Sequence, residues 1–449
     1  MGNIVYKLIP MYHNLLKRFS KLILILFTLS FPFISSAQNN QDLVKALNSK
    51  LIPIKTLSPD SDYSDLQPLK AILKDKGIVG LGEATHGTHD FFVYKHRMLE
   101  FLVKEMGYKA FVIEANFAGA QTMNDYVVYG KGNVYKGLWD MGIGVWMTQE
   151  FVDMANWLKD YNTGKPLSEC VHFYGCDMQG NQAASVIFRN YLTKTKQLTP
   201  VLDSGITQMA KYGNTLTKDD KVQIRTAITA LRQVTLTSLP DDSAQLFKHD
   251  IRAVEQYMDE MDAESTFFPA KSIDLRDKYM AENCAWIYNY IKGDKMVVWA
   301  HNQHISELKN SSGITPMGSY LKAQFKDNYY AFGFGFNSGT IRAYNAEAKK
   351  YQVYDVPPPV LTNSADAIFA QCNYPNFILD FKSASTDTAI NTFLNTELRS
   401  HAIGADFVSL LKNTTKYYVK QKLADVYDGI IFLRETTAAT PEKVVKKTP

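Results

Sequence analysis

Short apolar segments that alternate with amphipathic stretches are the feature that most constrains this fold. Residues 77–82 (GIVGLG) and 110–114 (AFVIE) have the length and composition of buried strands. Between them, residues 89–106 place apolar side chains at helical spacing, and Gly107 follows as a typical helix stop. A strand, a helix and a strand in this order predict a parallel βαβ unit with a right-handed crossover.

The same pattern returns later in the chain. Further strands are predicted at 171–175, 296–300, 329–336, 377–381 and 429–433. We therefore expect an α/β fold with a mainly parallel central sheet flanked by helices.

One long stretch, residues 181–292, has no strand signal. It contains amphipathic helical patterns instead, including 218–237 and 272–292. We expect a helical insertion that caps the carboxyl edge of the sheet as a lid. This insertion would divide the α/β domain into a first part at 38–180 and a second part at 293–449.

Residues 1–37 have the organisation of a signal peptide. Four basic residues precede an apolar run at 22–34 that is short for a membrane crossing, and small residues follow at 35–37. We expect cleavage after Ala37 and a periplasmic or secreted protein with no membrane association afterwards. A buried N-terminal helix and an uncleaved anchor are the alternatives.

Charge and cysteine content exclude several classes of protein. The predicted leader holds four of the 49 Lys and Arg residues and none of the 45 Asp and Glu residues, so the remaining chain is balanced. Nothing in it therefore favours a nucleic-acid partner. The four cysteines form no CxxC pair, which argues against a zinc ribbon, and we expect mostly buried free thiols.

Ionisable residues follow four of the predicted strands. Parallel strands end at one edge of a sheet, and ligands bind beyond that edge, so these residues should converge there although they are distant in sequence. They are Glu83, His86, Glu114, Asp177 and His301.

Each of these residues also has an ordinary structural interpretation. Glu83 and Asp177 can accept hydrogen bonds at the starts of the helices that follow them. His86 can be a solvated loop residue, and His301 a hydrogen-bonded core residue. Glu114 follows four apolar residues, where an unpaired carboxylate is costly, so it needs a partner. The same set could also bind a divalent metal.

Several catalytic and nucleotide-binding motifs are absent from the sequence. It contains no GxSxG, so the nucleophile elbow of serine hydrolases is missing. It also contains no GxxxxGK[ST], no GxGxxG after a strand and no HExxH, so neither nucleotide binding nor a zincin site is indicated.

The motifs that are present resemble those of the erythromycin esterase family. Residues 83–88 (EATHGT) are similar to the GExxHG signature, and further similarity lies at 82–97, 111–114, 174–179 (YGCDMQ), 276–283 (RDKYMAEN) and 300–302 (AHN). These motifs span about 70–320 in the family's order.

The resemblance implies a metal-independent, cofactor-free carboxylic ester hydrolase that opens a macrolide macrolactone with bound water and so confers macrolide resistance. By position, His86 matches the general base, Glu83 and Glu114 the essential carboxylates, and His301 the second essential histidine. Lys95 stands where the family often has arginine, which puts a bidentate contact in doubt.

The expected mechanism follows from these roles. Glu83 or Glu114 orients His86, which takes a proton from the attacking water, while His301, aided by Lys95, stabilises the oxyanion and helps protonate the leaving alkoxide. The residues expected to bind the substrate are Lys95, Asp177, Asn302 and Trp146. Trp139, Trp157, Phe91 and Phe92 can add an apolar wall, or serve as core residues instead.

Two other functions are considered. One is an esterase or lactonase that uses the same mechanism on a non-macrolide substrate. The other is an exported glycan-binding protein with a degenerate site. The complete ionisable set argues against simple binding, which does not need two buried carboxylates and two histidines.

The leader prediction is tested by N-terminal sequencing of the exported protein. The mature chain should begin at Gln38, because Ala37 completes the small-residue cleavage pattern. A soluble cytoplasmic chain that still begins at Met1 would contradict it.

Overall fold

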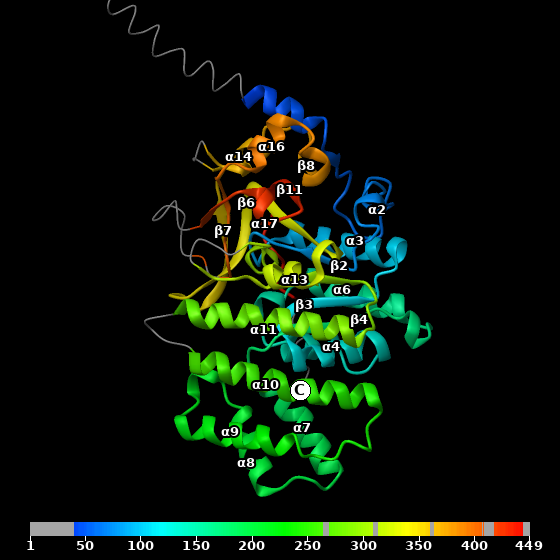
Figure 1. Ribbon diagram of the computed structural model, residues 1–449, viewed down its shortest axis with the longest axis vertical. Coiled ribbons are helices and arrows are strands. Elements are labelled where there is room, and N and C mark those ends of the chain that lie inside the picture. The colour runs from blue at the N-terminus through cyan, green and yellow to red at the C-terminus, as the bar shows by residue number, and fades with distance from the viewer. Residues whose placement is uncertain are drawn as a thin grey trace, which may run out of the picture.

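A nine-stranded sheet forms the centre of the protein (Figure 1). The structure is a computed structural model, and it describes residues 40–263, 269–308, 313–359, 363–405, 407 and 417–442. The strands follow the order β1-β8-β11-β6-β2-β5-β3-β4, and β7 pairs with β6. Their bounds are β1 Ile52–Pro53, β2 Ile78–Leu81, β3 Ala110–Asn116, β4 His172–Asp177, β5 Met296–Trp299, β6 Tyr329–Asn345, β7 Lys350–Val356, β8 Asn376–Asp380 and β11 Gly429–Thr436.

The middle of the sheet is parallel, as the sequence predicts. β11, β6, β2, β5, β3 and β4 pair in parallel with their neighbours in that order. Every residue of β2, β3 and β5 is buried, which explains why β2, β5 and residues 110–113 of β3 are continuously apolar rather than alternating. The mixed edge was not predicted: β8 is antiparallel to β11 and β1, and β7 is antiparallel to β6.

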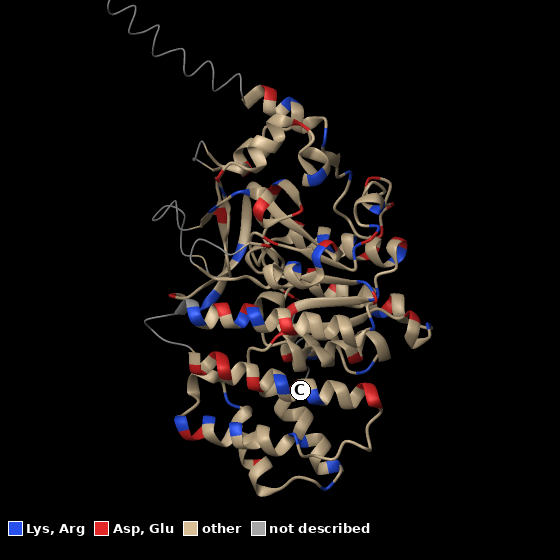
Figure 2. Cartoon of the chain, in the orientation of Figure 1, with Lys and Arg blue, Asp and Glu red and all other residues tan. Residues whose placement is uncertain are grey.

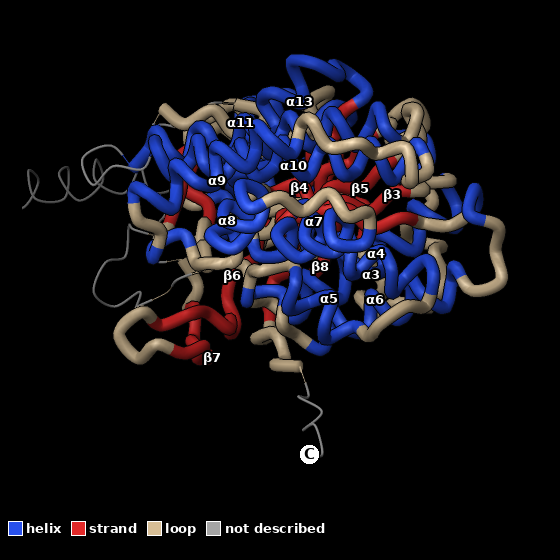
Figure 3. The backbone as a smooth tube through the Cα atoms, turned by 90° about the horizontal axis from the view of Figure 1, so that it is seen from below, coloured by secondary structure: helices blue, strands red, loops and turns tan. Residues whose placement is uncertain are grey.

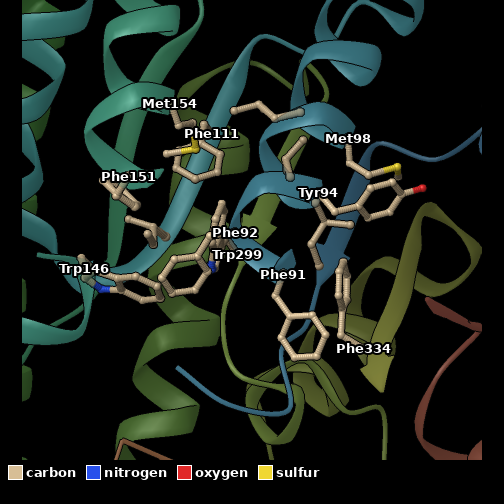
Figure 4. Close-up of a cluster of buried hydrophobic side chains, with 14 of the residues drawn as sticks. Phe91, Phe92, Tyr94, Met98, Phe111, Trp146, Phe151, Met154, Trp299 and Phe334 are labelled. Carbon is tan, nitrogen blue, oxygen red and sulfur yellow. The ribbon is translucent and has the colours of Figure 1, made fainter. Parts of the chain in front are cut away.

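Helix α3 (His89–Met106) has the predicted bounds and covers one face of the sheet. Gly107 ends it in the left-handed conformation, with φ 73°, which glycine adopts without a steric cost. Its apolar side chains, among them Phe91 and Phe92, pack into the cluster shown in Figure 4. Both of these phenylalanines are therefore core residues, as is Trp146 of the same cluster.

The predicted helical stretch is confirmed within the described residues. Its helices are α7 Gln182–Lys194, α8 Pro200–Met209, α9 Lys218–Leu231, α10 Asp241–Ala263 and α11 Pro269–Tyr290. Figures 1 and 3 show α7–α10 grouped at one end of the molecule, and residues of α7–α10 share a separate apolar core. α11 instead contacts β4, so it links this group to the sheet.

Opposite charges intermingle along the outward helices of this group (Figure 2). Arg225 binds Asp259 on α10, with 3.0 Å between Nη2 and Oδ1. Arg252 binds Glu282 on α11, with 2.7 Å between Nε and Oε1. These pairs connect α9, α10 and α11 at the surface, where each is expected to contribute no more than about 1 kcal/mol.

Two further sequence expectations can be compared with the structure. The four cysteines are buried free thiols, as expected. No helix among the described residues has the length and apolar content needed to cross a membrane. The predicted leader, residues 1–37, lies outside the described residues.

Backbone hydrogen bonds hold residues 437–441, which follow β11, against the rest of the protein. Thr437 accepts a hydrogen bond from the backbone N–H of His89 at 2.8 Å, and Ala439 donates to the carbonyl of Gly87 at 3.0 Å. Gln149 donates to the carbonyl of Thr440 at 2.9 Å. Backbone groups hold this polar segment in place, and it binds the backbone of the loop that precedes α3.

Gly87 allows this loop to pack closely against β6. A Cβ atom added at Gly87 would lie 1.6 Å from the carbonyl oxygen of Arg342, a backbone atom. Gly87→Ala should therefore lower the free energy of unfolding by about 1–3 kcal/mol, measured by urea denaturation.

Gly404→Ala is the matched control for this substitution. Nothing lies within 4 Å of a Cβ atom placed at Gly404, so its unfolding midpoint should stay near that of wild type. Equal stability of the two variants would show that the loop can yield around residue 87.

Candidate active site

The ionisable residues predicted at the strand ends do converge. Paired residues such as Leu81 and Trp299 align the ends of β2 and β5, and β3 is aligned with β5 in the same way. At this edge, Glu114 Oε2 accepts a hydrogen bond from the backbone N–H of His301 at 3.0 Å. The rings of His86 and His301 lie 4.9 Å apart between centroids.

Glu83 is the partner of His86. His86 Nδ1 lies 2.6 Å from Glu83 Oε1, and the Glu83 side chain is completely buried. Burial raises the pKa of Glu83, but Lys95 and His86 outweigh it and hold the pKa below its usual value. Because an ionised carboxylate can only accept, Nδ1 carries the proton, and in the neutral ring Nε2 of His86 then holds the lone pair. Helix α3 begins with Thr88 as its N-cap, so Glu83 does not cap it.

Two further donors complete the environment of Glu83. Its Oε2 accepts from Lys95 Nζ at 2.8 Å and from Trp299 Nε1 at 2.9 Å. Lys95 is fully buried, with Nζ 4.4 Å from the centre of the Trp299 ring. Burial lowers the pKa of Lys95 to about 8, against the opposing effect of Glu83. Lys95 therefore supports the Glu83–His86 pair, and its predicted substrate contact stays untested.

Glu114 belongs to a second cluster, and it does not hydrogen bond to His86. Arg276 Nη2 donates to Glu114 Oε1 at 2.9 Å and to Asp177 Oδ2 at 2.6 Å. Burial raises the pKa of Glu114, but His304 and Arg276 hold it well below its usual value. Asp177 is completely buried and binds this guanidinium, whereas Asn181 is the N-cap residue of α7. The helix-cap interpretation of Asp177 is thus wrong.

His301 is buried but incompletely hydrogen bonded. Its Nδ1 accepts from the backbone N–H of Gln303 at 3.2 Å, so the proton of the neutral ring lies on Nε2. That Nε2 has no hydrogen-bond partner among the residues that the structure describes. Burial, then the nearby His86 and His304, lower the pKa of His301 to about 3. Near neutral pH it therefore offers one uncharged N–H beside the His86 ring.

His304 and Arg276 also belong to the site, although the pattern of ionisable residues after the predicted strands does not include them. His304 Nδ1 lies 2.8 Å from Asp277 Oδ1, and its Nε2 lies 3.3 Å from Glu114 Oε1. Although burial opposes it, these carboxylates raise the pKa of His304 to about 10, so the ring is a buried cation. The signal in the sequence is the run 276–283, one of the segments that resemble the family, because it carries both Arg276 and Asp277.

A cavity of about 970 Å³ lies beside this site. It is bordered by α5 (Val134–Asp140) and by parts of α7, α10 and α11. Arg276 lines it, whereas Glu83, His86 and His301 do not. Its wall includes Trp139, one of the aromatic residues expected at an apolar wall, which is 69% exposed.

The residues predicted to bind substrate do not line this cavity. Trp146 is completely buried, and its Nε1 donates to the carbonyl of Glu114 at 2.9 Å. Both polar atoms of the Asn302 side chain bind the backbone of Phe334 on β6. Together with Lys95 and Asp177, these residues hold the site in place, and their direct contact with a substrate remains a prediction.

The carboxylates at this edge already accept hydrogen bonds from Lys and Arg side chains and from other N–H donors. Within the described part of the chain, no group of three or more His, Cys, Asp or Glu side chains is arranged to hold a metal ion. The arrangement instead provides an oriented imidazole with a free nitrogen, a neutral N–H donor and a buried guanidinium, which are the parts of an acid–base site.

Comparisons with known proteins point to one family. The sequence profile described as erythromycin esterase matches residues 103–436. The chain is 24% identical to erythromycin esterase type II of Escherichia coli over 434 residues, which cover 88% of this chain and 97% of that protein. It is also 24% identical to the putative hydrolase YbfO of Bacillus subtilis, over 86% of this chain and 89% of that one. A solved Bacillus cereus structure matches with TM-score 0.78 and 25% identity, covering 90% of this chain and 99% of that chain.

The buried charge of His304 predicts a pH-dependent stability. Its pKa rises from 6.5 to about 10 on folding, so the folded state binds the proton more tightly. The stabilisation is complete below about pH 6.5 and is lost as pH rises towards 10. His304→Gln should therefore be much less stable than wild type at pH 6, and the difference should shrink by pH 10, as measured by urea denaturation.

His172→Gln is the control, since His172 lies at the opposite end of β4 and burial lowers its pKa. Its stability relative to wild type should not change between pH 7 and pH 10. A constant deficit for His304→Gln across this range would mean that His304 is neutral in the folded protein.

Proposed function

The chain belongs to the erythromycin esterase family, and we propose that it is a carboxylic ester hydrolase that opens a macrolide macrolactone with histidine-activated water. The observation that carries the proposal is the 2.6 Å contact between Glu83 and His86 Nδ1. It leaves Nε2 as the only basic atom of that ring, beside a second imidazole that can donate.

The proposed reaction has two steps. Nε2 of His86 removes a proton from water while the water oxygen attacks the ester carbonyl, and Glu83 stabilises the imidazolium that forms. The tetrahedral intermediate then loses the alkoxide, which takes the proton back from His86. The products are a carboxylic acid and an alcohol, with one water added overall and no covalent enzyme intermediate.

His301 is proposed to stabilise the negative charge on the carbonyl oxygen. Its Nε2–H is uncharged and has no partner among the described residues. This donor can therefore bind the oxyanion without breaking a hydrogen bond within the described part of the protein. Donors fixed in this way are typically worth about 2.7–4 kcal/mol in the transition state. Lys95, first expected to share this role, is assigned to Glu83 instead, because Nζ lies 2.8 Å from that carboxylate.

The choice of a macrolide rests on the names of relatives and on the size of the cavity. The Escherichia coli relative is an erythromycin esterase, and a cavity of about 970 Å³ lies beside Arg276. We extend the proposal to macrolide resistance and to an exported protein, because residues 1–37 have the pattern of a signal peptide. A non-macrolide ester is the second candidate, since the same machinery would cleave it.

His86→Asn tests the proposal directly. General-base catalysis typically contributes about 10²–10⁴-fold, so turnover of macrolides and simple esters should fall by at least that factor. His301→Asn should reduce turnover less, since an amide N–H can replace part of its donor role. His172→Asn is the matched control and should keep wild-type turnover, because His172 begins β4 at the edge away from the site.

The products and the metal requirement complete this test. Mass spectrometry should show a gain of one water with the sugars intact, and turnover should survive exhaustive chelation. Near-normal turnover by His86→Asn would place the base elsewhere. Failure of wild type to cleave any macrolide or simple ester would favour the glycan-binding alternative.

A further inference from the structure

Glu260 is a buried carboxyl on the wall of the cavity, and it lacks a charged partner. It lies on α10 and is 7% exposed. Its Oε1 accepts long hydrogen bonds from Gln179 Nε2 at 3.3 Å and from Ser272 Oγ at 3.4 Å. Its Oε2 is buried and has no hydrogen-bond partner among the described residues. A carboxyl in this state favours a ligand that can supply the missing partner.

The other charged groups of the cavity wall already compensate one another. Lys136 binds Asp140 on the same helix, and Arg276 is held by Glu114 and Asp177. Glu260 forms an ion pair with none of the described Lys, Arg or His side chains. Burial, together with Asp177, raises the pKa of Glu260 to about 7, so its ionised form is unfavourable in the free protein. A bound cation would remove that penalty.

Exposed apolar side chains line the same cavity as this carboxyl. Trp139 and Tyr212 are each 69% exposed, and Val186 and Ile273 are 56% and 42% exposed. They belong to four separate parts of the chain, and each lines the same cavity. Exposed apolar side chains that converge in one hollow indicate a binding site for an apolar body. The two aromatic rings can also attract a cation.

We propose that Glu260 is a specificity-determining residue that binds a basic amine on an otherwise apolar substrate. The inference rests on the proposed function, since it takes this cavity as the place where the ester substrate lies. It assigns one residue of the cavity wall to that function: Glu260 favours esters that carry an ammonium group away from the ester carbonyl. Glu260 pairs with the ammonium, while Trp139 and Tyr212 contact the apolar part.

Binding of two non-hydrolysable probes to the full chain tests this proposal without turnover. Octyldimethylammonium, the cation of a tertiary amine, carries a charge and one N–H donor at neutral pH, and 1-octanol has the same chain without the charge. Isothermal titration should show that wild type binds the cation at least about tenfold more tightly than the alcohol. Glu260→Gln should lose about tenfold or more in affinity for the cation and keep its affinity for the alcohol.

Asp250→Asn is the matched control. Asp250 lies on the same helix, is completely buried and also has one carboxyl oxygen without a partner, but it does not line the cavity. Its removal should leave the preference for the cation unchanged. Neither variant should be less stable than wild type, because each removes a buried carboxyl that lacks a cation. If thermal unfolding shows that Glu260→Gln is less stable than wild type, Glu260→Met can replace it in the comparison of affinities for the cation and the alcohol.

The outcomes separate this inference from the proposed function. Unchanged cation affinity in Glu260→Gln or Glu260→Met, an equal loss in Asp250→Asn, or no cation binding to wild type would overturn the role of Glu260. Failure to hydrolyse any ester would overturn the proposed function, whereas the probe measurements would still report on Glu260.

Discussion

The buried carboxylate of Glu83 is the interaction on which the architecture of the site depends. An ionised group removed from water is costly unless donors replace the lost hydration. Here the donors come from three different places: His86 from the loop after β2, Lys95 from α3 and Trp299 from β5. The loop after β2, helix α3 and strand β5 must therefore be correctly packed together before the Glu83 carboxylate has all its hydrogen-bond donors. The orientation of the imidazole therefore depends on the packing of all these elements.

A second buried cluster extends this coupling to the helical region. Arg276 on α11 binds Glu114 at the end of β3 and Asp177 at the end of β4, so a helix of the predicted insertion completes the polar edge of the sheet. The same guanidinium lines the cavity. α11 also contacts β4, whereas α7–α10 share their own core, and the lid role of the insertion stays a prediction.

The sequence was informative where structure is encoded locally. An apolar run that ends in an ionisable residue marked β2, β3 and β5, and 3.6-residue spacing with a terminal glycine marked α3. Long-range pairing could not be inferred in this way. Trp299 is 216 residues from Glu83, and nothing in either segment specifies that they meet. The same limit hid the roles of Arg276 and His304, the antiparallel β7 and the packing of the polar segment 437–441.

That segment has a consequence for the order in which the protein folds. The hydrogen bond between Asp90 and Thr437 joins residues 347 positions apart. Contacts with so large a separation carry a high loop-closure entropy, so they form after the intervening strands have paired. The backbone of Gly87, next to the imidazole of His86, is among the groups that this segment binds. We therefore expect the loop that carries His86 to reach its final conformation late in folding, after β2 and β5 have paired.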